Sequence, residues 1–541
     1  MKSLLCTSKG KEMNWGTIYL SILITYVISH GLMLTLYGAW WDDMLLWNVS
    51  SELLDNFMGG SNFNNPFLYY IVKSISEIDD IKTMTFVYRL VPFICWLISI
   101  SAFFYFVKKI SRNKQFTLYS SLLAASCGLN KCMIMINCYH YTISIMLFMI
   151  GLVLYTYDYY KEKLAYKILV ALLWTLSLLI WRSAVLVIPV ALLYVSYLKK
   201  GLVWNSFASY KFLLLYMLKH YWIIIAGLFV FAILYKTILA PQGVYAAYYS
   251  IRIKYMLFSP ITTVLCCISL ILGYISNLLS EFAKANGPVF LLLFFVVCIF
   301  SIFLYRTKNC KNNNEINIYM LLLACLFLFF SILPHLLREL SFSFDIHGYK
   351  SRVAALAIFP ISMILAYGLI KIRNKVVQSI TCCILVVMSV IYCINTYLSY
   401  EKGWLKNEAI ACLFKEKECL KGKNIVFVDN SRMYSPFNNE GYRYYDYEGC
   451  ARLSYGKNDN TKCSELNALV NYKRFGDADY YIFINANENY SHIGLRSIFY
   501  RFSKNDKRDK MKMKMLSFRL YTKDNYASNK YLLIDKDKQI R

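Results

Sequence analysis

Two adjacent carboxylates, Asp42 and Asp43, come directly after Trp40 and Trp41, at the end of the first long hydrophobic segment. Tryptophan favours the boundary between a bilayer and water, so the acidic pair is expected at a membrane surface. A carboxylate held there is suited to act as a general base that takes a proton from a hydroxyl group. Neighbouring carboxylates repel, which raises the proton affinity of one of them. Either aspartate could fill this role.

The polar stretch over residues 38–85 holds further candidates for contacts with a substrate. Glu52 and Asp55 are three positions apart, so a helix over Leu45–Leu54 would carry both on one face. The leucines and valine of that segment would form an opposite, apolar face, as in a helix that lies along a membrane surface. Tyr69 belongs to the same stretch. The alternative is that these acids only solvate a loop.

The elements that must position these residues are transmembrane helices. Of 541 residues, 58% are hydrophobic and 17% are charged, whereas soluble domains carry about a quarter charged residues. The apolar residues gather in long blocks, which is typical of a polytopic membrane protein. The blocks cover residues 15–37, 86–107, 116–136, 141–157, 164–180, 183–198, 221–240, 261–280, 288–305, 317–334, 353–370 and 376–399. They predict about 12–13 transmembrane helices, the first of them an anchor rather than a signal peptide.

Basic residues in the short loops predict the orientation of these helices. The cytoplasmic turns are marked by Lys108–Lys114, Lys199–Lys200, Arg306–Lys311 and Lys371–Lys375. With the N-terminus inside, residues 38–85 form a first outer loop and residues 335–352 form another. Lys200 and Arg306 are both assigned to the cytoplasm, so the chain must cross the membrane an even number of times between them, but the sequence there has three apolar blocks. Either the stretch around 206–220 also crosses, or one of the three blocks is re-entrant or interfacial.

A small soluble domain is predicted over residues 401–541, after a transmembrane domain over residues 1–400. Its short apolar runs have the length of strands and are separated by polar loops. These runs are Asn424–Val428, Asp479–Ile484, Ser517–Tyr521 and Tyr531–Ile534. The pattern predicts an α/β or α+β domain, which the count of crossings places outside the cytoplasm. There, Cys412–Cys419 or Cys450–Cys463 could form disulfides or remain free thiols.

The charge and the cysteine pattern exclude several classes of function. The net charge of +27 is explained by cytoplasmic loops and a basic C-terminal region, and basic surface near a membrane also attracts phosphate head groups. Nucleic acid is not an expected partner of so apolar a chain, and no matching motif occurs. No cysteine spacing is typical of zinc, and no glycine-rich phosphate loop is present. No cluster of His, Asp or Glu has a spacing that is diagnostic of a metal site, and no cofactor is certain.

The order of three motifs resembles the N-terminal module of the GT-C membrane glycosyltransferases. The motifs are Asp42-Asp43, Asn65-Pro66-Phe67-Leu68-Tyr69-Tyr70 and Tyr88-Arg89-Leu90-Val91-Pro92. They look like the branch of protein O-mannosyltransferases and the lipid A aminoarabinose transferase, where an acidic residue precedes a Pro-Pro-Leu-Tyr-type and then an Arg-Leu-Pro segment. This chain has Asn-Pro-Phe for the double proline and Asp-Asp for the more usual Asp-Glu. Clear matching covers residues 15–110.

The resemblance implies an enzyme that moves a sugar from a polyprenyl-phosphate carrier to a lipid or glycan acceptor on the outer face of a membrane, expected to be a bacterial inner membrane. Direct displacement would invert the anomeric carbon, with Asp42 or Asp43 as the base. Glu52, Asp55 and Tyr69 would then lie near the acceptor. The resemblance also makes a divalent metal ion at the acidic loop possible, since some relatives use one there.

The leaving phosphate would need cations beside it. Candidates for this role are Arg89, Arg182, His335, Arg338, His347, Lys350 and Arg352. The alternative for Arg182, which interrupts two apolar runs, is the turn of a short helical hairpin. His140 is expected outside as well, as a structural histidine.

Two other functions are compatible with the number of spans. An O-antigen-type polymerase or ligase would rely on basic residues in a later outer loop and would not need the early aspartates. A transporter or flippase for a lipid-linked glycan would have charges along a pathway through the membrane. The acids of this chain cluster outside the apolar blocks, which favours an enzyme.

Overall fold

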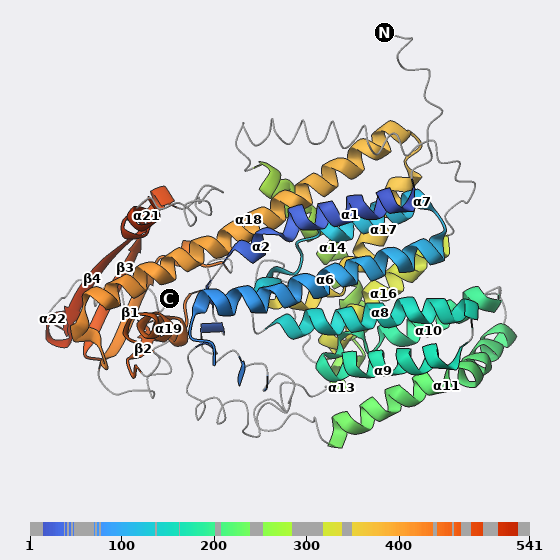
Figure 1. The fold of residues 1–541 in the computed structure, drawn as a ribbon, viewed down its shortest axis with the longest axis horizontal. Coiled ribbons are helices and arrows are strands. Elements are labelled where there is room, and N and C mark those ends of the chain that lie inside the picture. The colour runs from blue at the N-terminus through green and yellow to red at the C-terminus, as the bar shows by residue number, and fades with distance from the viewer. Residues whose placement is uncertain are drawn as a thin grey trace, which may run out of the picture.

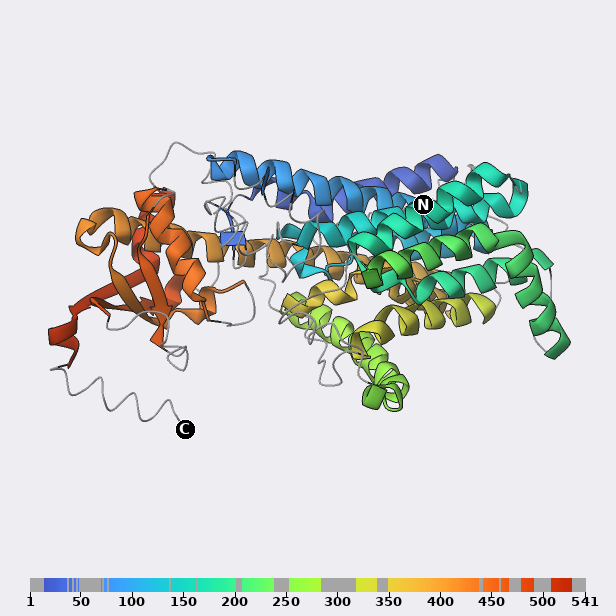
Figure 2. The ribbon, with the colours of Figure 1, turned by 90° about the horizontal axis from the view of Figure 1, so that it is seen from below.

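A computed structural model describes residues 14–36, 38–40, 43–44, 47, 70, 73–74, 77–135, 138–161, 163–200, 207–237, 253–283, 318–337, 349–436, 441–456, 459–466, 478–490 and 507–527. These residues form a helical bundle and a small sheet-containing domain at one end of it (Figures 1 and 2). One long helix, α18, runs from the bundle into the small domain.

The bundle is built from helices of very different length. In chain order they are α1 (Trp15–His30), α2 (Leu32–Thr35), α6 (Ile81–Ser111), α7 (Lys114–Ser126), α8 (Tyr139–Lys161), α9 (Leu164–Ile180), α10 (Val187–Lys200), α11 (Phe207–Thr237), α13 (Ile253–Met256), α14 (Ser259–Ala283), α16 (Ile318–Leu336), α17 (Ile358–Lys371) and α18 (Lys375–Glu416). The short 3-10 helices among them are η3 (Lys131–Ile134), η5 (Arg182–Ala184) and η7 (Tyr349–Ala355).

Seven helices among the described residues are long and apolar enough to cross a membrane. They cover Trp15–Thr35, Ile81–Ser111, Tyr139–Tyr157, Leu218–Thr237, Ser259–Ala283, Ile318–Leu336 and Lys375–Glu416. Two shorter apolar helices are α9 and α17. The chain is therefore a polytopic helical protein whose helices are compatible with an integral membrane location. The predicted block 288–305 lies outside the described residues, so the number of 12–13 spans stays a prediction.

Helix α7 differs from the predicted block 116–136, because it ends at Ser126 and passes into a non-helical segment and then η3. Every residue from Phe116 to Ser126 is buried, so α7 has no side that faces lipid. Two of its serines satisfy their hydroxyls within the helix, since Ser120 donates to the Phe116 carbonyl at 2.7 Å and Ser126 to the Leu122 carbonyl at 3.0 Å. Non-helical backbone within a membrane is tolerated only where protein encloses it, and Cys127 and Leu129 of this segment are buried.

Helix α11 contains the stretch around 206–220 for which the sequence left a crossing open. Its backbone leaves helical geometry at Tyr221, where φ is −122° and ψ is 18°. Two helical pieces therefore meet at a kink, and the part of α11 that is long and apolar enough to span, Leu218–Thr237, begins just before it.

The small domain is an α/β fold. Its strands are β1 (Asn424–Asn430), β2 (Lys462–Glu465), β3 (Tyr480–Ala486) and β4 (Leu516–Thr522), in the order β2-β1-β3-β4. β1 is parallel to β2 and β3, and β4 is an antiparallel edge. The consecutive buried residues Ile425, Val426 and Phe427 explain why β1 is central, because a parallel strand is covered on both faces. The domain also contains η8 (Glu418–Leu420), η9 (Arg432–Tyr434), α19 (Tyr444–Tyr455), η11 (Glu488–Tyr490), α21 (Lys507–Met515) and α22 (Lys523–Ala527).

Three of the four predicted strands are found, as β1, β3 and β4, and the fourth prediction, Tyr531–Ile534, lies outside the described residues. Strand β2 was missed because its four residues, Lys462–Glu465, contain no apolar run. The cysteines proposed as disulfide partners, Cys412, Cys419, Cys450 and Cys463, are all free thiols.

Helix α18 makes the bundle and the small domain continuous. It has 42 residues, which at 1.5 Å per residue gives a length of about 63 Å. Position 400, the predicted domain boundary, therefore lies inside a helix. A buried ion pair fixes β1 to its outer half, with 2.6 Å between Lys406 Nζ and Asp429 Oδ2 and no exposure of either side chain.

The helix ends divide into two groups. The end of α2 and the start of α6 lie at the end of the bundle that carries the small domain, and the turn between α6 and α7 lies at the opposite end (Figure 1). Lys108 and Lys109 lie in the last turn of α6 there, and Arg112 follows the helix. The two described ends of the first outer loop and the small domain are thus at one end of the bundle, and the basic turn is at the other.

Candidate functional site

Asp43 is the part of the acidic pair that the structure describes, and Asp42 lies outside the described residues. The Asp43 side chain is only 1% exposed. The Asp43 amide donates to the Trp40 carbonyl at 3.1 Å, and the Trp47 amide donates to the Asp43 carbonyl at 2.9 Å. We call residues 38–47 the acidic segment.

Arg89, on the first turns of α6, holds the start of the acidic segment in place. Its side chain is fully buried and donates to the carbonyls of Leu36 and Gly38, and to that of Ile134 at 3.3 Å. The Asp43 carboxylate is close enough to interact with the charge of Arg89. A guanidinium with this many protein partners is suited to fix backbone and to neutralise Asp43. It offers little of its surface to a phosphate.

Trp40 is buried in protein rather than exposed at a membrane surface. It is 2% exposed, and its ring lies 4.7 Å from Arg89 Cζ and 4.9 Å from the Tyr400 ring on α18. An arginine over an indole face is a favourable cation–π pair. The interfacial position expected for Trp40 is therefore replaced by packing against α18, which the sequence alone could not place beside it.

A second group of predicted residues gathers around Tyr141, and we call it the Tyr141 cluster. The ring of Tyr141 lies 4.0 Å from that of His140, 4.3 Å from that of Trp181 and 5.8 Å from Arg352 Cζ. The His335 ring follows at 5.9 Å from Trp181. His140 and His335 are each 9% exposed. Four segments far apart in the chain thus bring two histidines and an arginine onto one aromatic surface.

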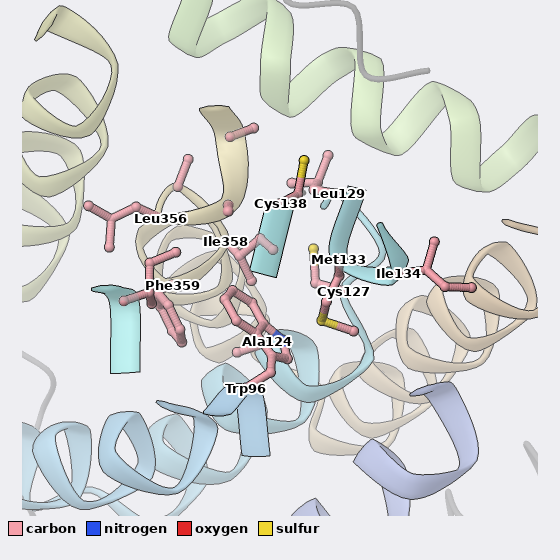
Figure 3. Close-up of a cluster of buried hydrophobic side chains, with 14 of the residues drawn as sticks. Trp96, Ala124, Cys127, Leu129, Met133, Ile134, Cys138, Leu356, Ile358 and Phe359 are labelled. Carbon is pink, nitrogen blue, oxygen red and sulfur yellow. The ribbon is translucent and has the colours of Figure 1, made fainter. Parts of the chain in front are cut away.

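The ends of helices position this cluster. His140 and Tyr141 lie on the first turn of α8, Trp181 ends α9, His335 is in the last turn of α16, and Arg352 is in η7. The hydroxyl of Ser144 ties α8 to α9 by donating to the Trp181 carbonyl at 3.1 Å. Figure 3 shows an apolar core to which α6, α7, η3 and the start of α17 contribute. Within it, the rings of Trp96 and Phe359 are 5.5 Å apart.

The 3-10 helix η3 connects the acidic segment to the Tyr141 cluster. It contacts α6, α8 and η7. Its Ile134 carbonyl accepts from Arg89, and its Lys131 carbonyl accepts from the Tyr400 hydroxyl at 2.7 Å. Both groups of residues therefore belong to one end of the bundle.

Arg182 has a different environment from the other basic candidates. It forms the turn between α9 and α10, as the hairpin interpretation predicts, and its guanidinium lies 3.8 Å from the ring centre of Tyr235 on α11. No feature of the sequence pairs it with Tyr235.

Six further predicted site residues are not placed by the structure. Glu52, Asp55, Tyr69, Arg338 and His347 lie outside the described residues, and Lys350 is described in its backbone within η7 but not in its side chain. Among the residues that the structure does describe, no group of three His, Cys, Asp or Glu side chains could hold a metal ion.

One acid of the first outer loop has a clear structural role. Asp80 caps α6, because its carboxylate accepts from the Thr83 hydroxyl at 2.6 Å and from the amides of Lys82 and Thr83. These hydrogen bonds, led by the one from the Thr83 hydroxyl, lower the pKa of the Asp80 carboxyl below its ordinary value of 3.8. A carboxylate stabilised in this way is a poor base.

The comparisons with known proteins do not identify a family. No family model matches the chain, and no curated protein matches its sequence significantly.

Proposed function

We propose that the chain is a membrane glycosyltransferase of the GT-C kind that moves a sugar from a polyprenyl phosphate to a lipid or glycan acceptor. The observation that carries the proposal is the Tyr141 cluster at the same end of the bundle as the acidic segment. Cations beside aromatic rings suit a sugar phosphate, since aromatic faces pack on sugar rings and cations bind phosphate oxygens. Carboxylates at the same end suit the acceptor hydroxyl.

The reaction would be a single displacement at the anomeric carbon. The acceptor hydroxyl loses its proton to an aspartate as its oxygen bonds to that carbon, and the bond between the carbon and the phosphate oxygen breaks. The electron pair leaves with the polyprenyl phosphate. Arg352 and His335 would stabilise the charge that develops on the phosphate. The configuration at the anomeric carbon is inverted.

The burial of Asp43 divides the roles of the two aspartates. A base must reach the acceptor, whereas the Asp43 side chain is almost fully buried and lies near the charge of Arg89. We therefore assign Asp42 as the base and Asp43 as the counter-ion of Arg89. Removing one partner of a buried charge pair costs about 3–5 kcal/mol, because the other charge is left uncompensated.

The test compares Asp42→Asn, Asp43→Asn and Arg352→Gln in membranes supplied with short-chain polyprenyl-phosphate hexoses, with release of polyprenyl phosphate read by mass spectrometry. We expect Asp42→Asn to lower the rate about 10²–10⁴-fold without loss of folded protein. Asp43→Asn should lower the yield of folded protein. Arg352→Gln should slow release with normal folding.

Asp79→Asn, a substitution at an exposed acid of the same loop, is the matched control for the aspartates, and Arg373→Gln, between α17 and α18, is the control for Arg352. Wild-type activity in both Asp42→Asn and Asp43→Asn would exclude a base in the acidic segment. Activity of Arg352→Gln equal to that of Arg373→Gln would exclude the Tyr141 cluster as the phosphate site.

A further inference from the structure

The acidic segment is held from the side of the small domain as well as by Arg89. On α18, the Asn407 amide donates to the Ala39 carbonyl at 3.2 Å, and Asn407 is 1% exposed. One turn earlier, the Trp404 ring lies so close to Gly38 that a Cβ at that position would be 2.2 Å from it. The start of the segment therefore rests on the part of α18 that belongs to the small domain.

Helix α19 holds the other end of the segment. The guanidinium of Arg452 donates to the Met44 carbonyl at 3.1 Å, so it binds the backbone one residue after Asp43. Gly449, one turn earlier on α19, packs against Met44, because a Cβ there would lie 2.6 Å from Met44 Cε and 3.1 Å from Met44 Cβ. Trp47 and Met84 form a small apolar cluster against which Leu453 of α19 packs.

The contacts of the small domain with α18 keep these residues in place. Arg508 on α21 binds Glu408 at 2.7 Å, and the Trp404 indole donates to the same carboxylate at 3.0 Å. Lys406 is fixed to Asp429 of β1 by the buried ion pair. The surface that meets the acidic segment is thus set by the folded domain, and not by α18 alone.

We infer that Arg452 of the small domain is a positioning residue for the acidic segment, and this inference rests on the proposed function. By binding the Met44 carbonyl, Arg452 fixes the backbone next to Asp43. The domain then completes the site, although it lies more than 400 residues further along the chain. Without this bond, hydrogen bonds from Arg89 and Asn407 would still hold the start of the segment, whereas its far end would lose a hydrogen bond from a charged donor on α19.

The first arm of the test does not depend on enzymatic activity. Hydrogen exchange of the full chain in detergent, read by mass spectrometry on peptides over residues 36–47, reports the protected amides of Asp43 and Trp47. Arg452→Gln should speed exchange there by at least about tenfold, since a hydrogen bond from a charged donor is lost. Exchange in β1 and β3 should not change. Arg452→Lys should restore part of the protection, and Arg443→Gln, at an exposed position just before α19, is the matched control.

The second arm measures transfer at saturating and at limiting donor. Arg452→Gln should lower kcat, with Arg452→Lys intermediate, while KM for the donor changes little because the Tyr141 cluster is not touched. Unchanged exchange in Arg452→Gln would overturn the inference, whatever the activity. Faster exchange with unaltered kcat would overturn the positioning role. If wild-type protein shows no transfer with any donor, the proposed function fails, and the exchange arm still decides whether Arg452 holds the segment.

Discussion

At the residue scale, Gly38 combines two constraints at one position. Its φ is +130°, which L-residues rarely adopt, and the Trp404 ring occupies the space of a side chain. Gly38→Ala should therefore destabilise the protein by at least about 2 kcal/mol, from backbone strain and overpacking together. Thermal stability of the detergent-purified chain, followed by size-exclusion chromatography after heating, measures the effect.

Gly368→Ala is the matched control for Gly38→Ala. Gly368 lies in α17, and no neighbouring atom lies within 4 Å of the place that an alanine Cβ would take, so alanine there should be neutral or stabilise the helix by up to about 1 kcal/mol. Equal stabilities for the two variants would contradict the close packing of Gly38 on Trp404. Combining Gly38→Ala with Trp404→Leu should recover part of the loss if the clash dominates over the backbone strain.

The buried carboxylate of Asp429 gives the small domain a pH dependence. Burial opposes its ionisation, but the charge and hydrogen bond of Lys406, with hydrogen bonds from Ser431, hold the pKa of Asp429 below its ordinary value of 3.8. A lowered folded-state pKa adds stability that is present above pH 3.8 and is lost as the pH falls below it. Wild type should therefore be more stable than Asp429→Asn at pH 5, and the difference should shrink towards pH 3.

Denaturant unfolding at the two pH values, followed by circular dichroism, measures this difference. Glu465 acts in the opposite sense, because burial raises the pKa of its carboxyl above 4.5 even though Arg432 opposes the shift. Comparison with Asp429→Asn at each pH removes the contribution of Glu465, which both proteins share. A stability difference that stays constant between pH 5 and pH 3 would contradict the ionised state of Asp429.

At the element scale, α18 sets the rotation of the small domain relative to the acidic segment. One alanine inserted between Leu398 and Ser399 would rotate the outer half of α18 by about 100° and move it by about 1.5 Å. The contacts of Trp404, Asn407 and Arg452 with the segment should be lost. The Lys406–Asp429 pair should persist, because both residues move together.

Hydrogen exchange distinguishes these two effects. The peptide over residues 36–47 should exchange rapidly in the insertion variant, and β1 should keep its protection. The control is the same alanine inserted after Arg373, in the turn before α18, where the helix register is unaffected. Slow exchange of residues 36–47 in both variants would mean that Arg89 alone fixes the segment.

The sequence predicted the elements better than their ends. Long apolar blocks predicted α6, α8, α14, α16 and α18, because a bilayer demands length and hydrophobicity together. The predicted block 116–136 was wrong about α7. Its small residues suit a buried helix, but nothing in the sequence indicates that the helix ends at Ser126. The apolar signal also failed for β2, which pairs with β1 through backbone hydrogen bonds and needs no apolar run.

At the scale of the whole molecule, the site combines residues that the sequence could and could not supply. His335, Arg352 and the aspartates were chosen as candidates from the sequence because charge beside an apolar block is costly. Tyr141 and Trp181 were missed because aromatic side chains are common in a chain with 17% of them. Trp181 is adjacent to the candidate Arg182, whereas Tyr141 is adjacent to His140, which was expected to be structural. Arg452 had no sequence signal, since its role depends on α19 packing against a loop more than 400 residues earlier.

The side of the membrane on which this assembly lies can be tested with a native thiol. Cys419, in η8 of the small domain, is exposed and free. If the small domain and the acidic segment are extracytoplasmic, a membrane-impermeant maleimide should label Cys419 in intact cells or spheroplasts, and Cys419→Ser should remove that label. Cys325 is also exposed, but it lies within the apolar helix α16, where a polar reagent in water does not reach. Labelling of Cys419 only after permeabilisation would place the small domain in the cytoplasm, and the acidic segment with it, because the contacts of Arg452 and Asn407 keep them on the same side.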